Sequence, residues 1–248
     1  MTPEKELHFF SNPRTWRRGL DWYASQFDGS APIRGEASVG YTAWPKRKGV
    51  PERMASVVPE ARLLYVVRDP IERILSSWIQ RYSDGTESRP LREVLEVLEG
   101  NDIVERSRYY LQLEQYLEFY PKSQIHVICS EAMRTDRRAI LADVFRFLGV
   151  DPTFDTDRFD RIEHESRFKR RKGVIGRALQ RLAETPPARV LPPATRRRIG
   201  YWLYLPFTRS FERPTLDQCT RERLKQFLAP DAERLRQFTG QRFAEWSL

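Results

Sequence analysis

The sequence predicts an α/β fold in which helices flank both faces of a parallel sheet. Two segments carry this prediction. Residues 62–67 are predicted to form a strand, because residues 63–67 form an apolar run, and Pro70 follows it at the start of a helical pattern. Residues 124–129 have a strand pattern, and the helical pattern of residues 139–148 follows them and stops at Gly149. Strands and helices that alternate in this way build parallel sheets.

The elements before the first strand are short. Near-helical spacing of aromatic residues predicts a helix over residues 14–27, which ends at Asp28 and Gly29. Residues 35–41 are predicted to form a short strand after a turn. Residues 51–58 are predicted to form a short helix that begins with a proline.

Helical patterns dominate the rest of the chain. The helix after the first strand spans residues 68–82, and residues 84–90 form a loop. Residues 91–98 and 108–119 are predicted to be helices, the second with one apolar face. A helical tail over residues 216–246 is expected to dock on the core through its leucines and phenylalanines.

Length and charge limit the classes of protein that fit. The chain has 248 residues and no internal repeat, which predicts one domain over residues 1–248. Its formal net charge of +9 attracts polyanions. Because no zinc-finger spacing or RNA-binding aromatic motif accompanies this charge, nucleic acid is not the expected partner. A basic arm rich in proline and arginine occupies residues 168–213 within the domain.

Cysteine usage and hydropathy bear on location. Cys129 and Cys219 suggest neither a disulfide framework nor a metal cluster, which favours a reducing compartment and a cytoplasmic location. The first residues carry charges where a signal peptide needs an apolar core, and no apolar run is long enough to cross a bilayer. The sequence therefore predicts a protein without a transmembrane segment.

Arg68 and Ser76 are candidates for binding one anion. Arg68 follows a strand, so its guanidinium is expected at the carboxyl edge of the sheet, and Ser76 comes two helical turns later. Forked guanidinium donors, a hydroxyl and a helix N-terminus together suit a phosphate. The alternative is a structural arginine that pairs with Asp69 or Glu72.

Residues 67–78 resemble the 3′-phosphate-binding segment of the sulfotransferases that use 3′-phosphoadenosine 5′-phosphosulfate (PAPS). In that family an arginine and the serine eight residues later hold the 3′-phosphate, which implies the same role for Arg68 and Ser76. The similarity runs from about residue 3 to the C-terminus. It implies a P-loop NTPase-like parallel sheet.

The opening residues Lys5, Glu6 and His8 are the candidate catalytic groups. Sulfuryl transfer needs a base for the acceptor and cations on the sulfonate. A similar Lys-Glu segment carries the catalytic glutamate of the heparan sulfate N-sulfotransferases and 3-O-sulfotransferases, which implies that Glu6 is the general base and His8 the second candidate. On a strand, Glu6 and His8 would share one face, with Leu7 and Phe9 on the other. The alternative is that the charged residues and His8 are solvated surface groups.

Glu36, Ser38 and Tyr41 resemble the family segment that follows the catalytic one. That segment often lies beside the cofactor or the acceptor, which implies a substrate-binding role. Tyr41 is equally suited to packing in the core.

Arg171, Lys172 and Gly173 resemble the basic glycine loop of the cytosolic sulfotransferases. That loop clamps the 3′-phosphate and adenine side of the cofactor, which implies a cofactor-binding role here. The alternative is a solvated face, because runs of charged residues usually face water.

A glycine- and threonine-containing loop holds the 5′-phosphosulfate in this family. None of the 12 glycines stands in such a context or in a Walker-type one. We therefore expect an N-terminally incomplete domain whose sheet lacks its first strand and leaves ladder groups unpaired and apolar faces open. Each missing loop donor is worth roughly 100- to 1,000-fold in rate. The alternative is a catalytically inactive, polyanion-binding remnant of the fold.

The resemblance implies transfer of a sulfuryl group from PAPS to a hydroxyl or amine of an acceptor, and it implies no metal. A glycan or glycosylated small molecule is the expected acceptor, because the form Lys-Glu-x-His-Phe-Phe resembles the glycan-modifying branch of the family. A membrane-surface role for the basic and aromatic residues 196–207 is a further possibility.

Overall fold

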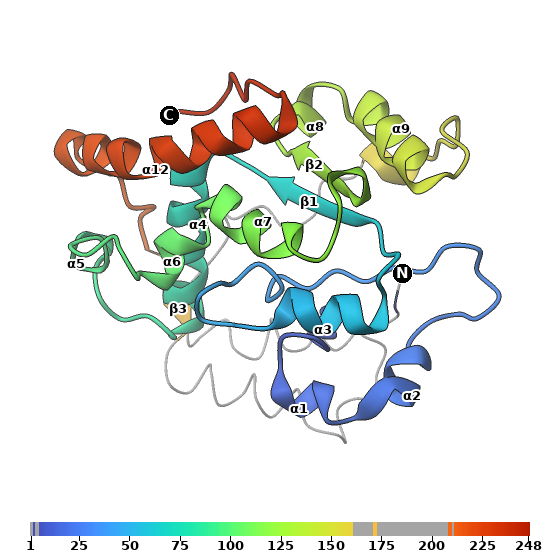
Figure 1. Cartoon of the computed structure of the whole chain (residues 1–248). Helices are drawn as coiled ribbons and strands as arrows, with labels where there is room; N and C mark the ends of the chain where they lie inside the picture. Colours follow the sequence, from blue (N-terminus) through green and yellow to red (C-terminus); the bar gives the residue numbers. More distant parts are fainter. Residues whose placement is uncertain (1, 3–4, 161–170, 173–207, 210) are drawn as a thin grey trace. The chain divides into compact units, whose positions relative to one another are not determined.

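The computed structural model describes every residue except 1, 3–4, 161–170, 173–207 and 210. Most of the basic arm at residues 168–213 therefore lies outside the described residues. The chain divides into two compact units. Unit 1 comprises residues 1–70, 97–159 and 223–248, and unit 2 comprises residues 71–96 and 160–222. Figure 1 shows the elements.

The described helices are mostly short. They are α1 Pro13–Trp16, α2 Gly19–Ala24, α3 Val50–Val57, α4 Pro70–Asp84, α5 Leu91–Val94, α6 Asp102–Glu105, α7 Tyr109–Leu117, α8 Ala132–Thr135, α9 Arg137–Leu148 and α12 Gln218–Thr239. Single 3₁₀ turns cover Lys122–Gln124 and Asp157–Asp160.

Two parallel strands form the sheet of unit 1. They are β1, Leu63–Val67, and β2, Ile125–Cys129, and they pair along their full length. The amide of Ser130 extends the ladder by donating to the carbonyl of Val67 (2.8 Å). Both strands fall where the sequence predicts them, and their parallel pairing confirms the α/β class.

One face of β1 is open. Among the described strands, β1 pairs with β2 alone. Leu64 and Val66 are 42% and 54% exposed, whereas Val67 is buried. Apolar side chains on a parallel strand are normally covered on both faces. The missing first strand remains a prediction.

The core of unit 1 gathers side chains from β1, β2, α7 and α12. Helix α7 contributes Tyr109, Leu113 and Tyr116, which recur every three to four residues and form its predicted apolar face. Helix α12 contributes Ala232 and Leu235. The predicted docking of the tail on the core is confirmed, but the helix ends at Thr239 and the helix predicted over residues 240–246 is wrong.

Local signals place most of the longer helices correctly. Helix α9 begins where the side chain of Asp136 accepts a hydrogen bond from the amide of Ala139 (3.0 Å). It ends at Gly149, whose φ of 72° is left-handed, as the sequence predicts. Helices α3, α4 and α7 also lie within two residues of the predicted bounds.

Three predicted elements are wrong. The helix expected over residues 14–27 is divided into α1 and α2, because Gly19, the first residue of α2, takes a left-handed φ of 83°. Residues 35–41 form no strand and instead lead into a turn. Residues 91–98 contain only the single turn of α5.

Unit 2 contains nearly all of α4. The buried side of this helix carries Ile71, Ile74, Leu75, Trp78 and Ile79. The ring of Trp78 stacks on that of Tyr82, with 4.6 Å between centroids. These contacts give α4 an apolar face within its own unit.

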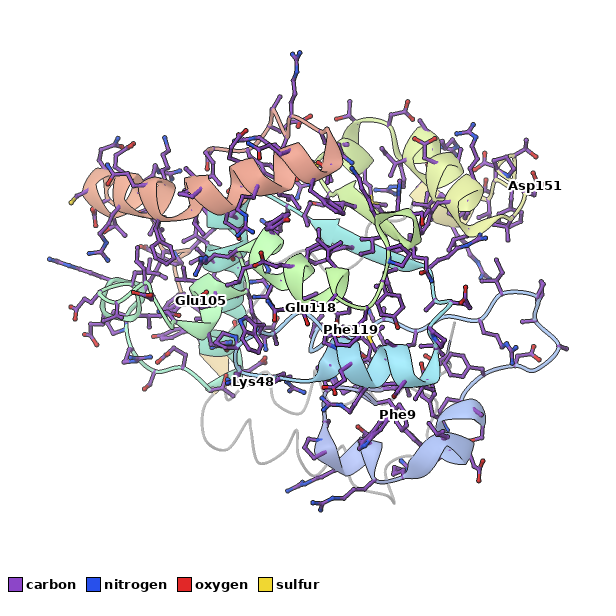
Figure 2. All side chains as sticks on the ribbon, in the orientation of Figure 1. Phe9, Lys48, Glu105, Glu118, Phe119 and Asp151 are labelled. Carbon is purple, nitrogen blue, oxygen red and sulfur yellow. The ribbon has the colours of Figure 1, made fainter. Side chains whose placement is uncertain are left out.

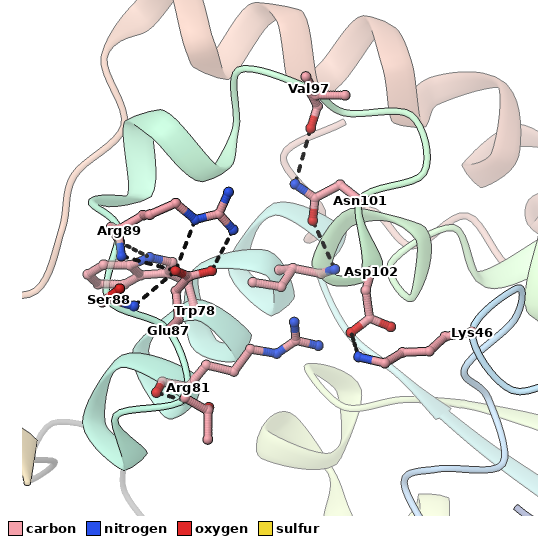
Figure 3. A network of polar contacts seen from close by, with 11 residues as sticks. Lys46, Trp78, Arg81, Glu87, Ser88, Arg89, Val97, Asn101 and Asp102 are labelled. Atoms are coloured by element: carbon pink, nitrogen blue, oxygen red, sulfur yellow. Dashed lines mark hydrogen bonds and ion pairs between the residues drawn. The ribbon is translucent and has the colours of Figure 1, made fainter. Parts of the chain in front are cut away.

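The carboxylate of Glu87 holds the loop after α4 together through hydrogen bonds (Figure 3). Its carboxylate accepts hydrogen bonds from the guanidinium of Arg89 (3.1 and 2.8 Å) and from the amides of Ser88 and Arg89 (2.9 and 3.0 Å). The Arg89 side chain is the main cause that lowers the pKa of Glu87 to about 2. The predicted loop is thus held by one carboxylate.

Asp231 of α12 caps the N-terminus of α7. Its carboxylate accepts hydrogen bonds from the amides of Tyr110 (3.0 Å) and Leu111 (2.8 Å). Burial raises the pKa of Asp231, and these two amides oppose that rise. Because the first amides of a helix have no partner inside it, this carboxylate ties α12 to α7.

Replacing Asp231 with alanine is expected to lower the free energy of unfolding by about 1 to 3 kcal/mol, because two amides lose their acceptor. Urea unfolding followed by circular dichroism measures the loss. Glu233→Ala is the control, since Glu233 lies exposed on the same helix, and it should cost at most about 0.5 kcal/mol. Equal losses in the two variants would contradict the capping role.

Candidate functional site

Glu6 and His8 lie together at the start of unit 1. Oε2 of Glu6 is 3.2 Å from Nε2 of His8, and the two side chains are 36% and 28% exposed. Leu7 and Phe9 are buried, whereas Lys5 is exposed. The structure therefore brings the two candidate bases together and leaves the lysine in solvent.

The backbone of this pair is not a strand. Glu6 and His8 take left-handed φ values of 62° and 52°, and Phe243 is the one other non-glycine residue with positive φ in the described part of the chain. The strand assumed for this segment is therefore wrong. Each such residue costs on the order of 1 to 3 kcal/mol, and strain of this kind clusters at functional sites.

Four hydrogen bonds hold the backbone of His8. Its carbonyl accepts from the amides of Ser11 (3.2 Å) and Asn12 (2.9 Å) and from Oγ1 of Thr15 (2.8 Å). Its amide donates to Oγ of Ser38 (2.9 Å). The left-handed turn at His8 is thus fixed from both sides of the residue.

The ring of His8 is held with Nε2 toward Glu6. Its Nδ1 is buried, and no described residue forms a hydrogen bond with it. Gly40 packs against this side of the ring, where a Cβ would lie 2.9 Å from Nδ1 and 2.8 Å from Oγ of Ser11. Of the two ring nitrogens, Nε2 is therefore the one that faces the carboxylate of Glu6.

Glu36 gathers the other predicted substrate-binding residues. Its Oε1 accepts hydrogen bonds from the hydroxyls of Tyr23 (3.0 Å) and Tyr41, and its Oε2 lies 3.4 Å from Oγ of Ser38. Ser38 in turn holds the amide of His8. Glu36, Ser38 and Tyr41 therefore form one network that supports the Glu6–His8 pair, and direct contact with a substrate remains a prediction for them.

An aromatic cluster lies under this network. The ring of Phe9 stacks on Tyr23 at 4.3 Å between centroids and contacts Trp16 at 5.0 Å and Trp22 at 6.0 Å. Figure 2 shows Phe9 between α3 and the pair α1 and α2. This cluster anchors the opening segment to the core of unit 1.

Arg68 lies directly after β1, at the carboxyl edge of the strand pair. Its amide donates to the hydroxyl of Tyr109 (3.3 Å). Asp69, the next residue, is buried, its amide donates to Oε1 of Glu131 (3.0 Å), and its Oδ2 accepts from the amide of Ser247. The backbone that presents Arg68 is therefore fixed where the sequence predicts an anion site.

Ser76 lies in α4 and is half-buried. It belongs to unit 2, whereas Arg68 belongs to unit 1. Glu72, one of the two acids considered as a partner for Arg68, forms an ion pair with Arg213 (2.6 Å) within unit 2. The convergence of Arg68 and Ser76 on one phosphate remains a prediction.

The predicted basic loop is described only in part. Arg171 and Lys172 form the short strand β3, which pairs in antiparallel fashion with β4, Thr208–Arg209. Gly173 lies outside the described residues. The clamp predicted for these three residues therefore remains a prediction.

Several residues that hold the site were not among the predicted ones. Asn12 caps α1 by accepting a hydrogen bond from the amide of Arg14 (3.0 Å), and Pro13 follows it. This helix-start signal is visible in the sequence and marks the turn after His8. Arg47 donates to the carbonyl of Ser11 (2.7 Å) across 36 positions, and no local signal marks that contact.

In the described part of the chain, no group of three or more His, Cys, Asp or Glu residues is placed to hold a metal ion. No described helix is long and apolar enough to cross a membrane.

The chain is similar to proteins of a known family. The family model for the sulfotransferase domain matches residues 3–227. Human bifunctional heparan sulfate N-deacetylase/N-sulfotransferase 2 is 24% identical over 182 residues, which cover 66% of this chain and 20% of that protein. Human heparan sulfate glucosamine 3-O-sulfotransferase 5 is 29% identical over 161 residues, which cover 60% of this chain and 45% of that protein. The chain thus spans less than half the length of these curated relatives.

A solved structure shares the fold. A sulfotransferase from Alicyclobacillus acidocaldarius superposes with a TM-score of 0.64 at 24% sequence identity, over 100% of this chain and 87% of that one. Its likeness shows a common α/β architecture.

Tyr23 and Tyr41 are expected to stay protonated near pH 11, where exposed tyrosines, with a pKa of about 10, are largely ionised. Burial is the main cause that raises the pKa of both, and Glu36 raises it further. Because the folded-state pKa lies above the unfolded value, the stability these residues contribute is complete below about pH 10 and falls as the pH rises further.

Phenolate absorbance after a rapid jump to alkaline pH measures the ionisation of these tyrosines over time. The expected result is a fast phase from accessible tyrosines and a slow phase that follows unfolding, and Tyr41→Phe should reduce the slow phase alone. Fast ionisation of all 10 tyrosines would contradict the buried network.

Proposed function

Because this chain belongs to the sulfotransferase domain family, we propose that it transfers a sulfuryl group from PAPS to a hydroxyl or amine of an acceptor. The observation that carries the proposal is the Glu6–His8 pair, joined at 3.2 Å on a strained backbone that four hydrogen bonds fix. A base fixed in this way suits an in-line displacement, in which positioning and electrostatics supply most of the rate.

The proposed roles follow from the chemistry of the transfer. The acceptor oxygen or nitrogen forms the new bond to sulfur, and the bond from sulfur to the 5′-phosphate oxygen breaks. Glu6 takes the proton of the acceptor, and His8 orients the Glu6 carboxylate through Nε2. The leaving group is 3′,5′-adenosine bisphosphate. No metal has a role in this proposal.

The residues present fit a 3′-phosphate at the carboxyl edge of the strand pair. Arg68 follows β1 directly, and the hydroxyl of Tyr109 fixes its amide at 3.3 Å. We propose that the guanidinium of Arg68 binds this phosphate, because an arginine that follows a parallel strand lies at the edge of the sheet where such ligands bind. We assign the same phosphate to Ser76 in the next helix, and the adenine side of the cofactor to the segment of Arg171, Lys172 and Gly173.

A glycan or a glycosylated small molecule is the proposed acceptor. The names of two relatives specify heparan sulfate as their substrate, which supports a sugar here. Glu36, Ser38 and Tyr41 are proposed to form the acceptor side of the site. The two cysteines are both free, Cys129 buried and Cys219 exposed, which supports the proposed location in the reducing cytoplasm.

Replacing Arg68 with alanine is expected to weaken the binding of 3′,5′-adenosine bisphosphate by roughly 10- to 100-fold, because hydrogen bonds to a charged phosphate are lost. Isothermal titration calorimetry measures the change. Arg146→Ala is the matched control, since Arg146 is an exposed arginine of the same unit, and it should leave the affinity unchanged.

Two outcomes of this titration would contradict the proposal. One is equal affinity in Arg68→Ala and the unsubstituted chain. The other is no binding of the nucleotide together with salt-sensitive retention on heparin, which would identify a polyanion-binding protein instead.

Glu6→Gln is expected to lower the rate of sulfuryl transfer by roughly 100- to 10,000-fold while leaving nucleotide affinity unchanged, because the amide cannot accept the acceptor proton. Transfer from PAPS to a sugar acceptor is measured with the natively purified protein. Glu60→Gln, an exposed acid of the same unit, serves as control. If the Glu6→Gln variant keeps the full rate of transfer, Glu6 is not the general base.

A further inference from the structure

The segment that follows α12, residues 240–248 (the α12 extension), is bound to both strands of unit 1. The side-chain amide of Gln241 donates to the carbonyl of Val127 in β2 (3.0 Å). The backbone amide of Ser247 donates to Oδ2 of Asp69 (2.5 Å), two residues after the end of β1. The α12 extension therefore joins β2 to the residues that leave β1.

The α12 extension has a fixed conformation of its own. Phe243 and Trp246 are buried, and their rings stack with 4.3 Å between centroids. The amide of Trp246 donates to the carbonyl of Phe243 (3.0 Å), and Nε of Arg236 donates to the carbonyl of Arg242 (3.0 Å). Phe243 takes a left-handed φ of 49°, a conformation that a non-glycine residue keeps only where its surroundings hold it.

The link between β1 and α4 contains Arg68 and Asp69, and the α12 extension supports both. The amide of Arg68 donates to the hydroxyl of Tyr109 (3.3 Å). The ring of Tyr109 lies against that of Trp246, with 5.7 Å between centroids. The carboxylate of Asp69 accepts the hydrogen bond from Ser247. The extension thus contacts Asp69 directly and Arg68 through Tyr109.

Glu131 holds the same link from the side of β2. Its Oε1 accepts a hydrogen bond from the amide of Asp69 (3.0 Å). Its Oε2 accepts from Sγ of Cys129 (3.3 Å) and from Oγ of Ser130 (3.2 Å). Burial opposes the ionisation of Glu131, yet these hydrogen bonds lower its pKa below the ordinary value, the amide of Asp69 foremost. One ionised carboxylate therefore joins the residues after β1 to those after β2.

The carboxylate of Asp69 makes the link sensitive to the α12 extension. Asp69 is 5% exposed, and a buried carboxylate is costly unless hydrogen bonds satisfy it. The amide of Ser247 supplies one of these bonds from 178 positions away in the sequence. If that amide is removed, Asp69 gains by moving toward water, and Arg68 moves with it because the two residues are adjacent.

We propose that the α12 extension positions the link that presents Arg68, so that anion binding by Arg68 depends on the backbone amide of Ser247. Ser247, Asp69 and Glu131 are then positioning residues that act through Arg68. A link that is already ordered binds its ligand without the cost of ordering it. The choice of a nucleotide phosphate as the anion rests on the proposed function, whereas the support of the link does not.

Hydrogen exchange of the full chain, followed by mass spectrometry, tests the support of the link without any ligand. Ser247→Pro removes the amide that donates to Asp69. It is expected to speed the exchange of the amides of Arg68 and Asp69 roughly 3- to 10-fold, because the link opens more often. Ser247→Ala keeps the amide and loses only a buried hydroxyl that bonds to no described residue. This matched variant should exchange at the unsubstituted rate.

Titration calorimetry with 3′,5′-adenosine bisphosphate tests the consequence for binding. Ser247→Pro and Asp69→Ala are each expected to weaken the nucleotide roughly 3- to 10-fold, because the link must then be ordered on binding. Asp69→Asn is expected to recover most of the affinity, since the side-chain oxygen of asparagine still accepts the amide of Ser247. Circular dichroism checks that every variant is folded.

Three results would overturn the inference. They are unchanged exchange of Arg68 and Asp69 in Ser247→Pro, an unchanged nucleotide affinity in that variant, and an Asp69→Asn variant as weak as Asp69→Ala. The last result would mean that Asp69 acts by its charge and not by accepting the amide. If the unsubstituted chain binds no nucleotide, the proposed function fails, and the exchange rates alone decide whether the extension supports the link.

Discussion

The burial of Leu7, Phe9 and Phe10 is the constraint on which the rest of the site depends. Phe9 and Phe10 are adjacent, so a regular strand would point them to opposite faces. Left-handed turns at Glu6 and His8 allow both rings to reach the core. Each turn costs about 1 to 3 kcal/mol, and burial of each phenylalanine returns about 1.5 to 3 kcal/mol. The polar side chains of Glu6 and His8 are thereby left together and partly exposed at the surface.

Much of the fold is predictable because its signals are local. The apolar run of β1, the proline after it and the glycine that ends α9 each act within a few residues of the element they define. The division of α1 from α2 is harder to predict from the sequence. Gly19 takes a left-handed backbone conformation, and glycine can adopt several others. The resemblance to a family with known chemistry also predicts roles for Glu6 and Arg68, and these roles remain predictions.

The geometry of the site is not predictable in the same way. The bond from the amide of His8 to Ser38 spans 30 positions, and the contact of Arg47 with Ser11 spans 36. Contacts of this range depend on the packing of several elements at once, and no spacing in the sequence encodes them.

Gly40 determines how much space the imidazole of His8 can occupy. A Cβ at this position would come within 2.9 Å of Nδ1, 2.8 Å of Oγ of Ser11 and 3.2 Å of Nη1 of Arg47. Ser11 and Arg47 are tied to each other, so the residue best able to yield is His8 itself. Positions 8 and 40 should therefore vary together as such proteins diverge, with a side chain at position 40 only where position 8 no longer carries an imidazole ring.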